Sequence, residues 1–452
     1  MRAPHRSGKS FSISMPIAVL AAMLGVLWLA GGASRADAFG QVLVRAAAWL
    51  ALIAVLVGMQ RPAMRDVRPV LLLLLAALGL ALLQLVPLPP GVWQALPGRV
   101  AFERAAVLIG EQQPWRPLAI VPGAAYNAAA SLVVPGVVFV LLAGLEEREA
   151  AWLPGMILAF IAAATLPGLA QFAGAGFNNP LINDSPGQMS GIFANRNHFA
   201  LLMAFGCLVA PVWAFADGSG AIWKMAAAAG LVLVFALTIL ATGSRAGLLV
   251  GALAISIGFI LVRRRIRHVL RRAPRWVFPA LIVGVIAALV IVVLLSVAAD
   301  RAVSIERAMA MDAGQDMRRR GLPTVLEMIR IYFPVGSGLG GFDPLFRMHE
   351  PFELLKPTYF NHAHNDFLEI VLDTGLIGLL LLVVAIGWWG WASIRAWRAS
   401  HDRTQILARL GSAMILLVLL ASIFDYPART PTMMALLVVA AVWLAKGTSR
   451  PA

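Results

Sequence analysis

Charged residues are scarce in this sequence. Asp, Glu, Lys and Arg together make up 13% of the 452 residues, whereas hydrophobic residues make up 60%. Ordinary soluble domains have about 25% charged and about 45–50% apolar residues, so the composition excludes a chain of soluble domains and indicates a polytopic membrane protein. Cysteine is scarcer still: the single one, Cys207, lies in an apolar run and can form no internal disulfide.

Acidic residues are also in short supply. The chain has 22 Asp and Glu against 37 Lys and Arg, which gives a formal net charge of +15. Such an excess raises the question of nucleic-acid binding. Here, however, the basic residues occur in short clusters between apolar runs, and membrane topology explains this distribution better because Lys and Arg concentrate in cytoplasmic connections.

Long apolar runs dominate the rest of the sequence. A helix needs about 17–25 predominantly apolar residues to cross about 30 Å of hydrocarbon. Twelve segments meet this condition, so we expect an all-α integral membrane protein with about 12 transmembrane helices. The segments are centred near residues 23, 51, 78, 136, 162, 206, 232, 253, 288, 380, 416 and 438.

The basic clusters predict the orientation of these spans. If the spans alternate, all the clusters fall on one side, which the positive-inside rule assigns to the cytoplasm together with both termini. The clusters are residues 1–9, 61–68, 263–272 and 395–403. Residues 1–298 then hold nine spans, residues 299–366 form a large outward loop, and residues 367–452 hold three spans. An A-x-A pattern at 36–38 also fits a signal-peptidase site, whose use would leave the remaining topology unchanged.

Arginines occur where outward connections meet helices. Arg196 (in NRNHFALL) and Arg245 (in GSRAGLLVG) each stand at the entrance to a span, and residues 318–320 are three arginines before a short helical pattern. Two interpretations remain open. Such arginines are often interfacial anchors that reach the headgroups, but a planar guanidinium at a helix N-terminus also suits phosphate oxygens. Their outward placement opposes the usual charge bias and favours an anion site.

The segment NHAHNDFLEIVLDTGLIG, residues 361–378, gathers ionisable groups at the start of an apolar run. A metal site built on His362 and His364 would need further ligands, but Phe367 stands where the pattern H-x-H-x-D-H has its last histidine, and the sequence offers no second His/Cys cluster. We therefore expect no metal. The nearby GSGLGG (336–341) lacks the Lys-Ser/Thr of a P-loop and is expected to be a tight turn.

His364 is the candidate general base, because an imidazole can take up a proton near neutral pH. A histidine at a loop–helix junction is otherwise a helix cap or a surface group. Asn365, Glu369 and Asp373 are spaced by four and share a face if helical. If the helix has begun by His364, only this histidine shares a groove with Glu369, and His362 diverges. We therefore expect His362 to be largely dispensable.

These motifs together resemble a known family. HNDFLEIVLDTGLIGLLLLV resembles the signature of the O-antigen ligase and O-antigen polymerase superfamily, in which His-Asn, Leu-Glu and Gly-Leu-Ile-Gly run into a span. The supporting pieces occur in the family's order over residues of about 190–435. They are NRNHFA, GSRAG, an arginine before a helix, P-x-G-x-G-x-G-x-F (334–342) and FDYPARTP (424–431).

The resemblance implies a GT-C-like glycosyltransferase of the bacterial cell inner membrane that works on the periplasmic face without metal, cofactor or nucleotide sugar. It would move a glycan from undecaprenyl diphosphate to lipid A–core, a polysaccharide or a protein. The residues it implies are the general base His364 and two diphosphate-binding arginines, Arg245 and one of the triplet 318–320, for which we choose Arg319. From the residues themselves we add Arg196, ranked lower, as a further diphosphate-binding arginine and Asn365 and Glu369 as supporting groups. The family commonly has an aromatic residue about four positions after this second arginine, where the choice of Arg319 puts Pro323. Arg318 and Arg320 therefore stay open as alternatives to Arg319.

Other functions are kept as alternatives. A transporter or flippase for an anionic lipid-linked glycan would be expected to carry charges in mid-span and helices broken at matching positions of two halves. The charges of this sequence are concentrated at the outward ends of its spans, and no such halves are visible. A non-catalytic assembly scaffold is the third possibility. Ligase and polymerase both remain open, because an acceptor pocket leaves no readable motif.

Overall fold

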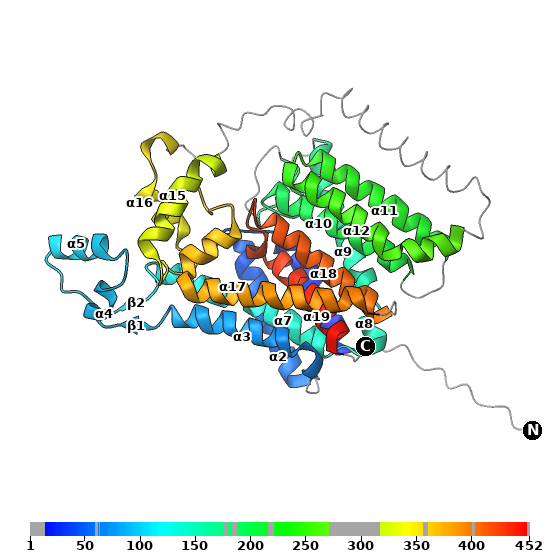
Figure 1. Ribbon diagram of the computed structural model, residues 1–452, viewed down its shortest axis with the longest axis horizontal. Helices are drawn as coiled ribbons and strands as arrows, with labels where there is room; N and C mark the ends of the chain where they lie inside the picture. The colour runs from blue at the N-terminus through cyan, green and yellow to red at the C-terminus, as the bar shows by residue number, and fades with distance from the viewer. Residues whose placement is uncertain are drawn as a thin grey trace, which may run out of the picture.

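The computed structural model is a bundle of long helices with a small extramembrane part at one end (Figure 1). The structure describes residues 14–58, 62, 64–174, 179–182, 188–215, 221–270, 317–355, 360–399 and 403–449. Within these ranges the only sheet is a pair of two-residue strands, β1 (Pro87–Leu88) and β2 (Arg116–Pro117), which are antiparallel with Leu88 opposite Arg116.

Ten helices of the described residues are long and apolar enough to cross a membrane, counting α6 and α7 as one and including η1 with α3 and α8 with α9. They are α2 (Phe39–Gly58), α3 (Arg68–Leu83), α6 (Pro122–Ser131) with α7 (Val133–Ala143), α9 (Leu153–Phe172), α10 (Arg196–Phe215), α11 (Ile222–Ala241), α12 (Arg245–Leu270), α17 (Asp366–Arg398), α18 (Arg403–Ala421) and α19 (Pro431–Ser449). A shorter apolar helix, α1 (Met15–Ala30), precedes them. The prediction of a polytopic all-α membrane protein is confirmed; the span expected near residue 288 lies outside the described residues.

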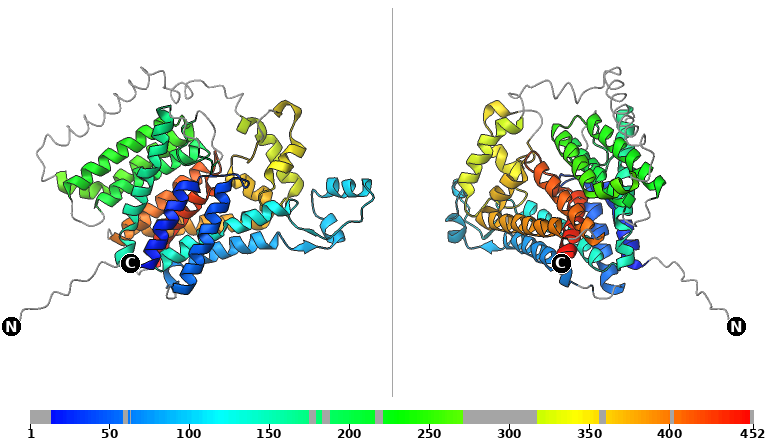
Figure 2. Two further views of the ribbon diagram at one scale, coloured as in Figure 1. Left: turned by 180° about the vertical axis from the view of Figure 1, so that it is seen from behind. Right: turned by 45° about the vertical axis from the view of Figure 1, so that its right-hand side comes forward.

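The remaining helices are short and connect or extend these spans. They are η1 (Arg65–Val67), α4 (Pro90–Gln94), α5 (Val100–Leu108), α8 (Glu147–Ala150), α15 (Met317–Tyr332), α16 (Phe342–His349), η2 (Phe352–Leu354) and η3 (Pro427–Arg429). In Figures 1 and 2, α4, α5, α15 and α16 all lie beyond the same end of the bundle. We call this end, where α10, α12, α17 and α19 begin, the site end.

Hydrogen bonds between helix termini define the two ends of the bundle. At the site end, Ser244 before α12 donates to Asn197 of α10, and Ser422 after α18 donates to Asp366 of α17. At the opposite end, the Arg265 guanidinium of α12 donates to the carbonyl of Phe215. The arginines in the last turns of α12 and α17 therefore lie away from the site end.

Helix α17 is broken where the Gly-rich turn (334–341) packs against it. Gly375 has φ 61° and ψ −143°, which interrupts the helix, and a Cβ at this position would collide with the Pro334 carbonyl. The turn supplies the missing partners: the Leu376 amide donates to the Pro334 carbonyl over 2.8 Å, and the Ser337 amide donates to the Leu372 carbonyl over 2.9 Å. The expected tight turn is present, and it hydrogen-bonds to the backbone of α17 on both sides of the interruption at Gly375.

A fully buried arginine ties the hairpin between α3 and α6 to this turn. The Arg99 guanidinium donates to the carbonyls of Leu118 at 2.9 Å and Gly336 at 3.2 Å and lies over the rings of Trp93 and Tyr332. Buried charges need such partners. Arg99 thus joins the segment between α3 and α6 to the Gly-rich turn that packs against α17.

Candidate functional site

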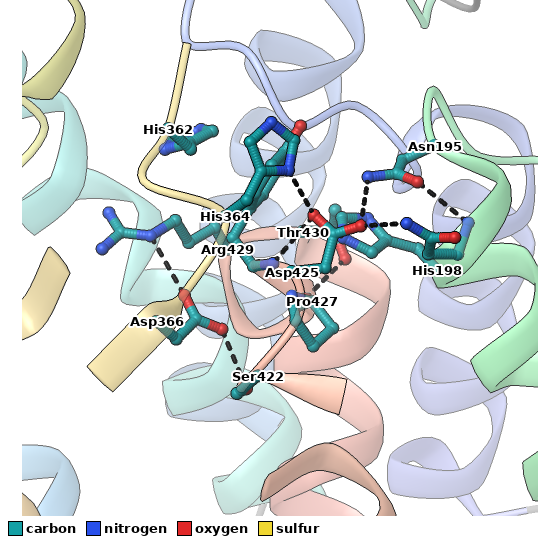
Figure 3. Close-up of polar contacts among 12 residues, drawn as sticks. Asn195, His198, His362, His364, Asp366, Ser422, Asp425, Pro427, Arg429 and Thr430 are labelled. Atoms are coloured by element: carbon teal, nitrogen blue, oxygen red, sulfur yellow. Dashed lines mark hydrogen bonds and ion pairs between the residues drawn. The ribbon is translucent and has the colours of Figure 1, made fainter. Parts of the chain in front are cut away.

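Asp425, in the connection between α18 and η3, lies at the centre of a convergent set of side chains (Figure 3). Its carboxylate accepts from His364 Nδ1 at 3.0 Å and from Asn195 Nδ2 at 3.0 Å. The Asn197 amide and the Arg318 guanidinium also donate to it, the latter over 3.3 Å. These five residues, which we call the Asp425 cluster, come from four separate segments of the chain.

The Asp425 cluster orients the imidazole of His364 through its Nδ1 atom. Burial opposes ionisation of Asp425, but the Arg318 guanidinium and the hydrogen bond from His364 hold its pKa well below the usual range. An ionised carboxylate only accepts hydrogen bonds, so Nδ1 of His364 must carry the proton. Its Nε2 is then the basic nitrogen, and the ring is 15% exposed. This is the arrangement of a general base oriented by a carboxylate.

The backbone turns sharply at His364 before α17 begins. His364 has φ 50°, a left-handed conformation that few non-glycine residues adopt. Asn365 is the N-cap of α17, and its side chain accepts from the Leu368 amide over 3.0 Å. Helix α17 starts only at Asp366, so His364 does not share the groove of Glu369, and that expectation is wrong. Asn365 thus caps the helix directly after His364.

Glu369 instead pairs with His362, in a second cluster around Arg429. His362 Nδ1 lies 2.8 Å from Glu369 Oε1. The partly buried Arg429 guanidinium contacts Glu369 at 3.2 Å, Asp366 at 3.2 Å and Asp373 at 3.6 Å. Burial disfavours its charge, but the three carboxylates outweigh burial and raise the pKa of Arg429. We call these five residues the Arg429 cluster.

Tyr426 separates the two clusters. Its ring centroid lies 4.1 Å from that of His362, 5.0 Å from that of His364 and 5.1 Å from that of the buried His198. Burial, with a smaller contribution from Asp425, raises the pKa of Tyr426 to about 12, so its phenol is neutral at physiological pH. His198 Nε2 lies 4.0 Å from Asp425 Oδ1, beyond hydrogen-bond distance. Tyr426 is therefore an uncharged spacer between two imidazoles.

The three arginines named from the sequence differ in how close they lie to the Asp425 cluster. Arg196 and Arg245 are the first residues of α10 and α12, next to Asn197 and Ser244, which are joined by a 2.7 Å hydrogen bond. Both helix starts therefore adjoin the cluster. Arg319 is exposed on α15, whereas its neighbour in the triplet, Arg318, reaches Asp425. Of the two, Arg318 is therefore the better candidate for a site residue than the predicted Arg319.

Sequence reasoning gave no role to Asp425, Tyr426 or Arg429. All three lie in FDYPARTP, which was noted for its resemblance alone. An aspartate and an arginine in a short connection between two apolar spans must find partners, since burying either charge alone is costly. That cost was the available signal. Among the described residues, no three His, Cys, Asp or Glu side chains form a group that could hold a metal ion.

The fold and site define a polytopic helical membrane protein with two histidine–carboxylate pairs at one end of its bundle. Comparison with protein families places part of the chain more specifically. The family model described as O-antigen ligase matches residues 229–383, a stretch that includes Arg245, Arg318 and His364. This match confirms the resemblance to the O-antigen ligase and polymerase superfamily. No curated protein matches the chain.

Proposed function

We propose that this protein transfers a glycan from undecaprenyl diphosphate to an acceptor hydroxyl, acting as an O-antigen ligase or a surface-polysaccharide polymerase. The pairing of His364 Nδ1 with the ionised Asp425 is the observation that carries the proposal, because it leaves Nε2 as the basic nitrogen in a cluster that Arg318 reaches. Arg196 and Arg245 begin the two helices that adjoin this cluster. The O-antigen ligase match over residues 229–383 supports the same class of reaction. The acceptor is lipid A–core, a polysaccharide or a protein.

The reaction follows from the roles of these groups. His364 Nε2 takes the proton of the acceptor hydroxyl as its oxygen attacks the anomeric carbon of the donor. The bond between that carbon and the diphosphate oxygen breaks, and undecaprenyl diphosphate leaves with the electron pair. Arg318, Arg245 and Arg196 stabilise the charge that develops on the leaving group. The diphosphate is a good leaving group by itself, so the proposal requires no metal and no cofactor.

The distribution of basic residues supports a periplasmic site. The arginines in the last turns of α12 and α17 lie at the end of the bundle opposite the site end. Under the positive-inside rule that opposite end faces the cytoplasm, so the site end faces the periplasm of a bacterial inner membrane. Helix α19 ends on the cytoplasmic side, where Lys446 donates to the Leu142 carbonyl. We place both termini in the cytoplasm.

A reconstituted assay tests the proposal. The probe is undecaprenyl-diphosphate-linked glycan extracted from cells lacking this protein, mixed with the envelope fraction of those cells as acceptor and with the purified protein. We expect glycan transfer by the wild type, also in EDTA, and a loss of about 10²–10⁴-fold in His364→Ala. A wild type that transfers nothing, or a His364→Ala protein with full activity, would contradict the proposal.

A further inference from the structure

His362 forms a second imidazole–carboxylate pair that the proposed chemistry does not use. Its Nδ1 lies 2.8 Å from Glu369, as that of His364 lies 3.0 Å from Asp425. The two imidazoles are 14% and 15% exposed, whereas the carboxylates behind them are 0% and 2% exposed. In each pair Nδ1 is committed to the buried carboxylate, which leaves Nε2 of His362 for a ligand.

The partner of His362 is itself held in place. The second oxygen of Glu369 accepts from the Ala363 amide over 2.8 Å, and the Arg429 guanidinium lies 3.2 Å from the first. A side chain whose own partner is fixed by further hydrogen bonds keeps one orientation. His362 is therefore held in one orientation, whereas a surface histidine at a loop–helix junction has no such fixed partner.

His362 is also placed beside the base. Both imidazoles lie against the Tyr426 ring, with centroid distances of 4.1 Å for His362 and 5.0 Å for His364. Only one residue separates the two in the chain, and the positive-φ turn at His364 directly follows His362 and Ala363. A substrate whose hydroxyl reaches His364 is therefore next to His362.

The charges around the two pairs indicate which substrate His362 meets. In the Arg429 cluster the one guanidinium is already paired with three carboxyl groups, so this side of Tyr426 presents no uncompensated positive charge to a diphosphate. The Asp425 cluster has one carboxylate with Arg318, and the starts of α10 and α12 bring Arg196 and Arg245 nearby. The donor diphosphate fits the arginine side. A neutral sugar fits the His362 side.

We infer that His362 binds a hydroxyl of the acceptor sugar next to the attacking one, with Glu369 and Arg429 as its positioning residues. This inference rests on the proposed function and divides its site into a donor half and an acceptor half. The partly exposed imidazole of His362 contacts the acceptor, and the buried Glu369 carboxylate holds that imidazole in place. Turnover itself stays with His364, so loss of His362 weakens acceptor binding and leaves the chemical step intact.

The test measures transfer at a fixed, saturating amount of extracted donor while the concentration of the acceptor envelope fraction is varied. In His362→Phe the ring contact with Tyr426 is kept and the hydrogen bonds are lost. We expect its apparent KM for the acceptor fraction to rise about three- to tenfold, the value of one hydrogen bond, with kcat within about twofold of wild type. His362→Gln, whose amide can still hydrogen-bond, should show a smaller rise. His349→Phe is the matched control, because His349 pairs with Tyr332 outside the site.

Undecaprenyl diphosphate is released whether the protein is a ligase or a polymerase. Its binding therefore distinguishes failure of the His362 inference from failure of the proposed function. We expect His362→Phe to bind it as the wild type does, which also shows that the variant is folded. An unchanged acceptor KM in His362→Phe, a fall in kcat alone, or weaker binding of undecaprenyl diphosphate would each overturn the assignment of His362 to the acceptor. If the wild type neither transfers glycan nor binds undecaprenyl diphosphate, the proposed function fails first and this inference falls with it.

Discussion

The Nδ1 atom of His364 lies 3.0 Å from the Oδ1 atom of Asp425, although the two residues are 61 positions apart in the chain. One precedes the first turn of α17, and the other follows the end of α18. Because α17 and α18 pack against each other, their adjoining ends bring a histidine and a carboxylate together. The site is thus a product of helix packing more than of any single motif.

Replacing Asp425 with Asn tests this relationship. The amide can donate to Nδ1 of His364, which stabilises the tautomer with its proton on Nε2, and that nitrogen can then no longer accept a proton. We expect kcat for glycan transfer to fall by about 10²–10⁴-fold, near the loss in His364→Ala. Asp343→Asn is the control, since Asp343 pairs with Arg347 on the exposed face of α16. An Asp425→Asn protein with more than half of the wild-type kcat would rule out the orienting role.

Arg318 and Arg319 provide a matched pair of variants one residue apart. Arg318 reaches the Asp425 carboxylate, and Arg319 is exposed on α15. We expect Arg318→Ala to lose transfer and to bind undecaprenyl diphosphate more weakly, and Arg319→Ala to behave as wild type. Arg318→Lys should rescue poorly, because a point charge cannot replace the planar fork of donors. The reverse order of the two alanine variants would restore the choice made from the sequence alone.

The spans could be predicted from the sequence because membrane thickness imposes one length and one polarity on each of them. The candidate base could be named because a family signature surrounds His364. Its partner could not, since the pairing of His364 with Asp425 depends on how two helix ends meet, and periodicity within one segment carries no such information. The spacing within the segment predicted that His364 shares a groove with Glu369. In the structure the backbone turns at His364, with φ 50°, and Glu369 pairs with His362 instead.

The choice among three consecutive arginines depends on a related property. Successive residues of a helix point about 100° apart, so the start of α15 decides which of Arg318, Arg319 and Arg320 faces the site. Pro323 lies inside α15 where the family commonly has an aromatic residue, so the family pattern does not fix which arginine takes the position. A helix phase is a three-dimensional property that a short motif does not determine.

Topology can be tested independently of activity. We expect a periplasm-active reporter such as alkaline phosphatase to be active after Gly110, in the turn that follows α5, and inactive after Ala399, at the end of α17. A cytoplasm-active reporter should show the opposite pattern. Activity of the periplasmic reporter at Ala399 and not at Gly110 would place the site end in the cytoplasm and would contradict the periplasmic assignment.

The Arg429 cluster makes a prediction about stability. Arg429 is the counter-charge that the structure gives to Asp366, Glu369 and Asp373 together, and its side chain is 19% exposed. Removing one partner of a buried ionic group leaves the others without compensation, which typically costs about 3–5 kcal/mol. We therefore expect Arg429→Ala to lower the thermal midpoint of the detergent-solubilised protein by several degrees and to reduce its yield.

The control for Arg429 is Arg330, which also contacts a carboxylate but on an exposed surface. The Arg330 and Glu327 side chains are 83% and 59% exposed, and their atoms are 3.5 Å apart. A pair of this kind contributes about 0–1 kcal/mol, so Arg330→Ala should unfold close to the wild-type midpoint. Equal midpoints for Arg429→Ala and Arg330→Ala would show that the three carboxylates do not depend on Arg429. In that case the three carboxyl groups would be protonated, the charge of Arg429 would be uncompensated, and the donor diphosphate would no longer be confined to the arginine side of Tyr426.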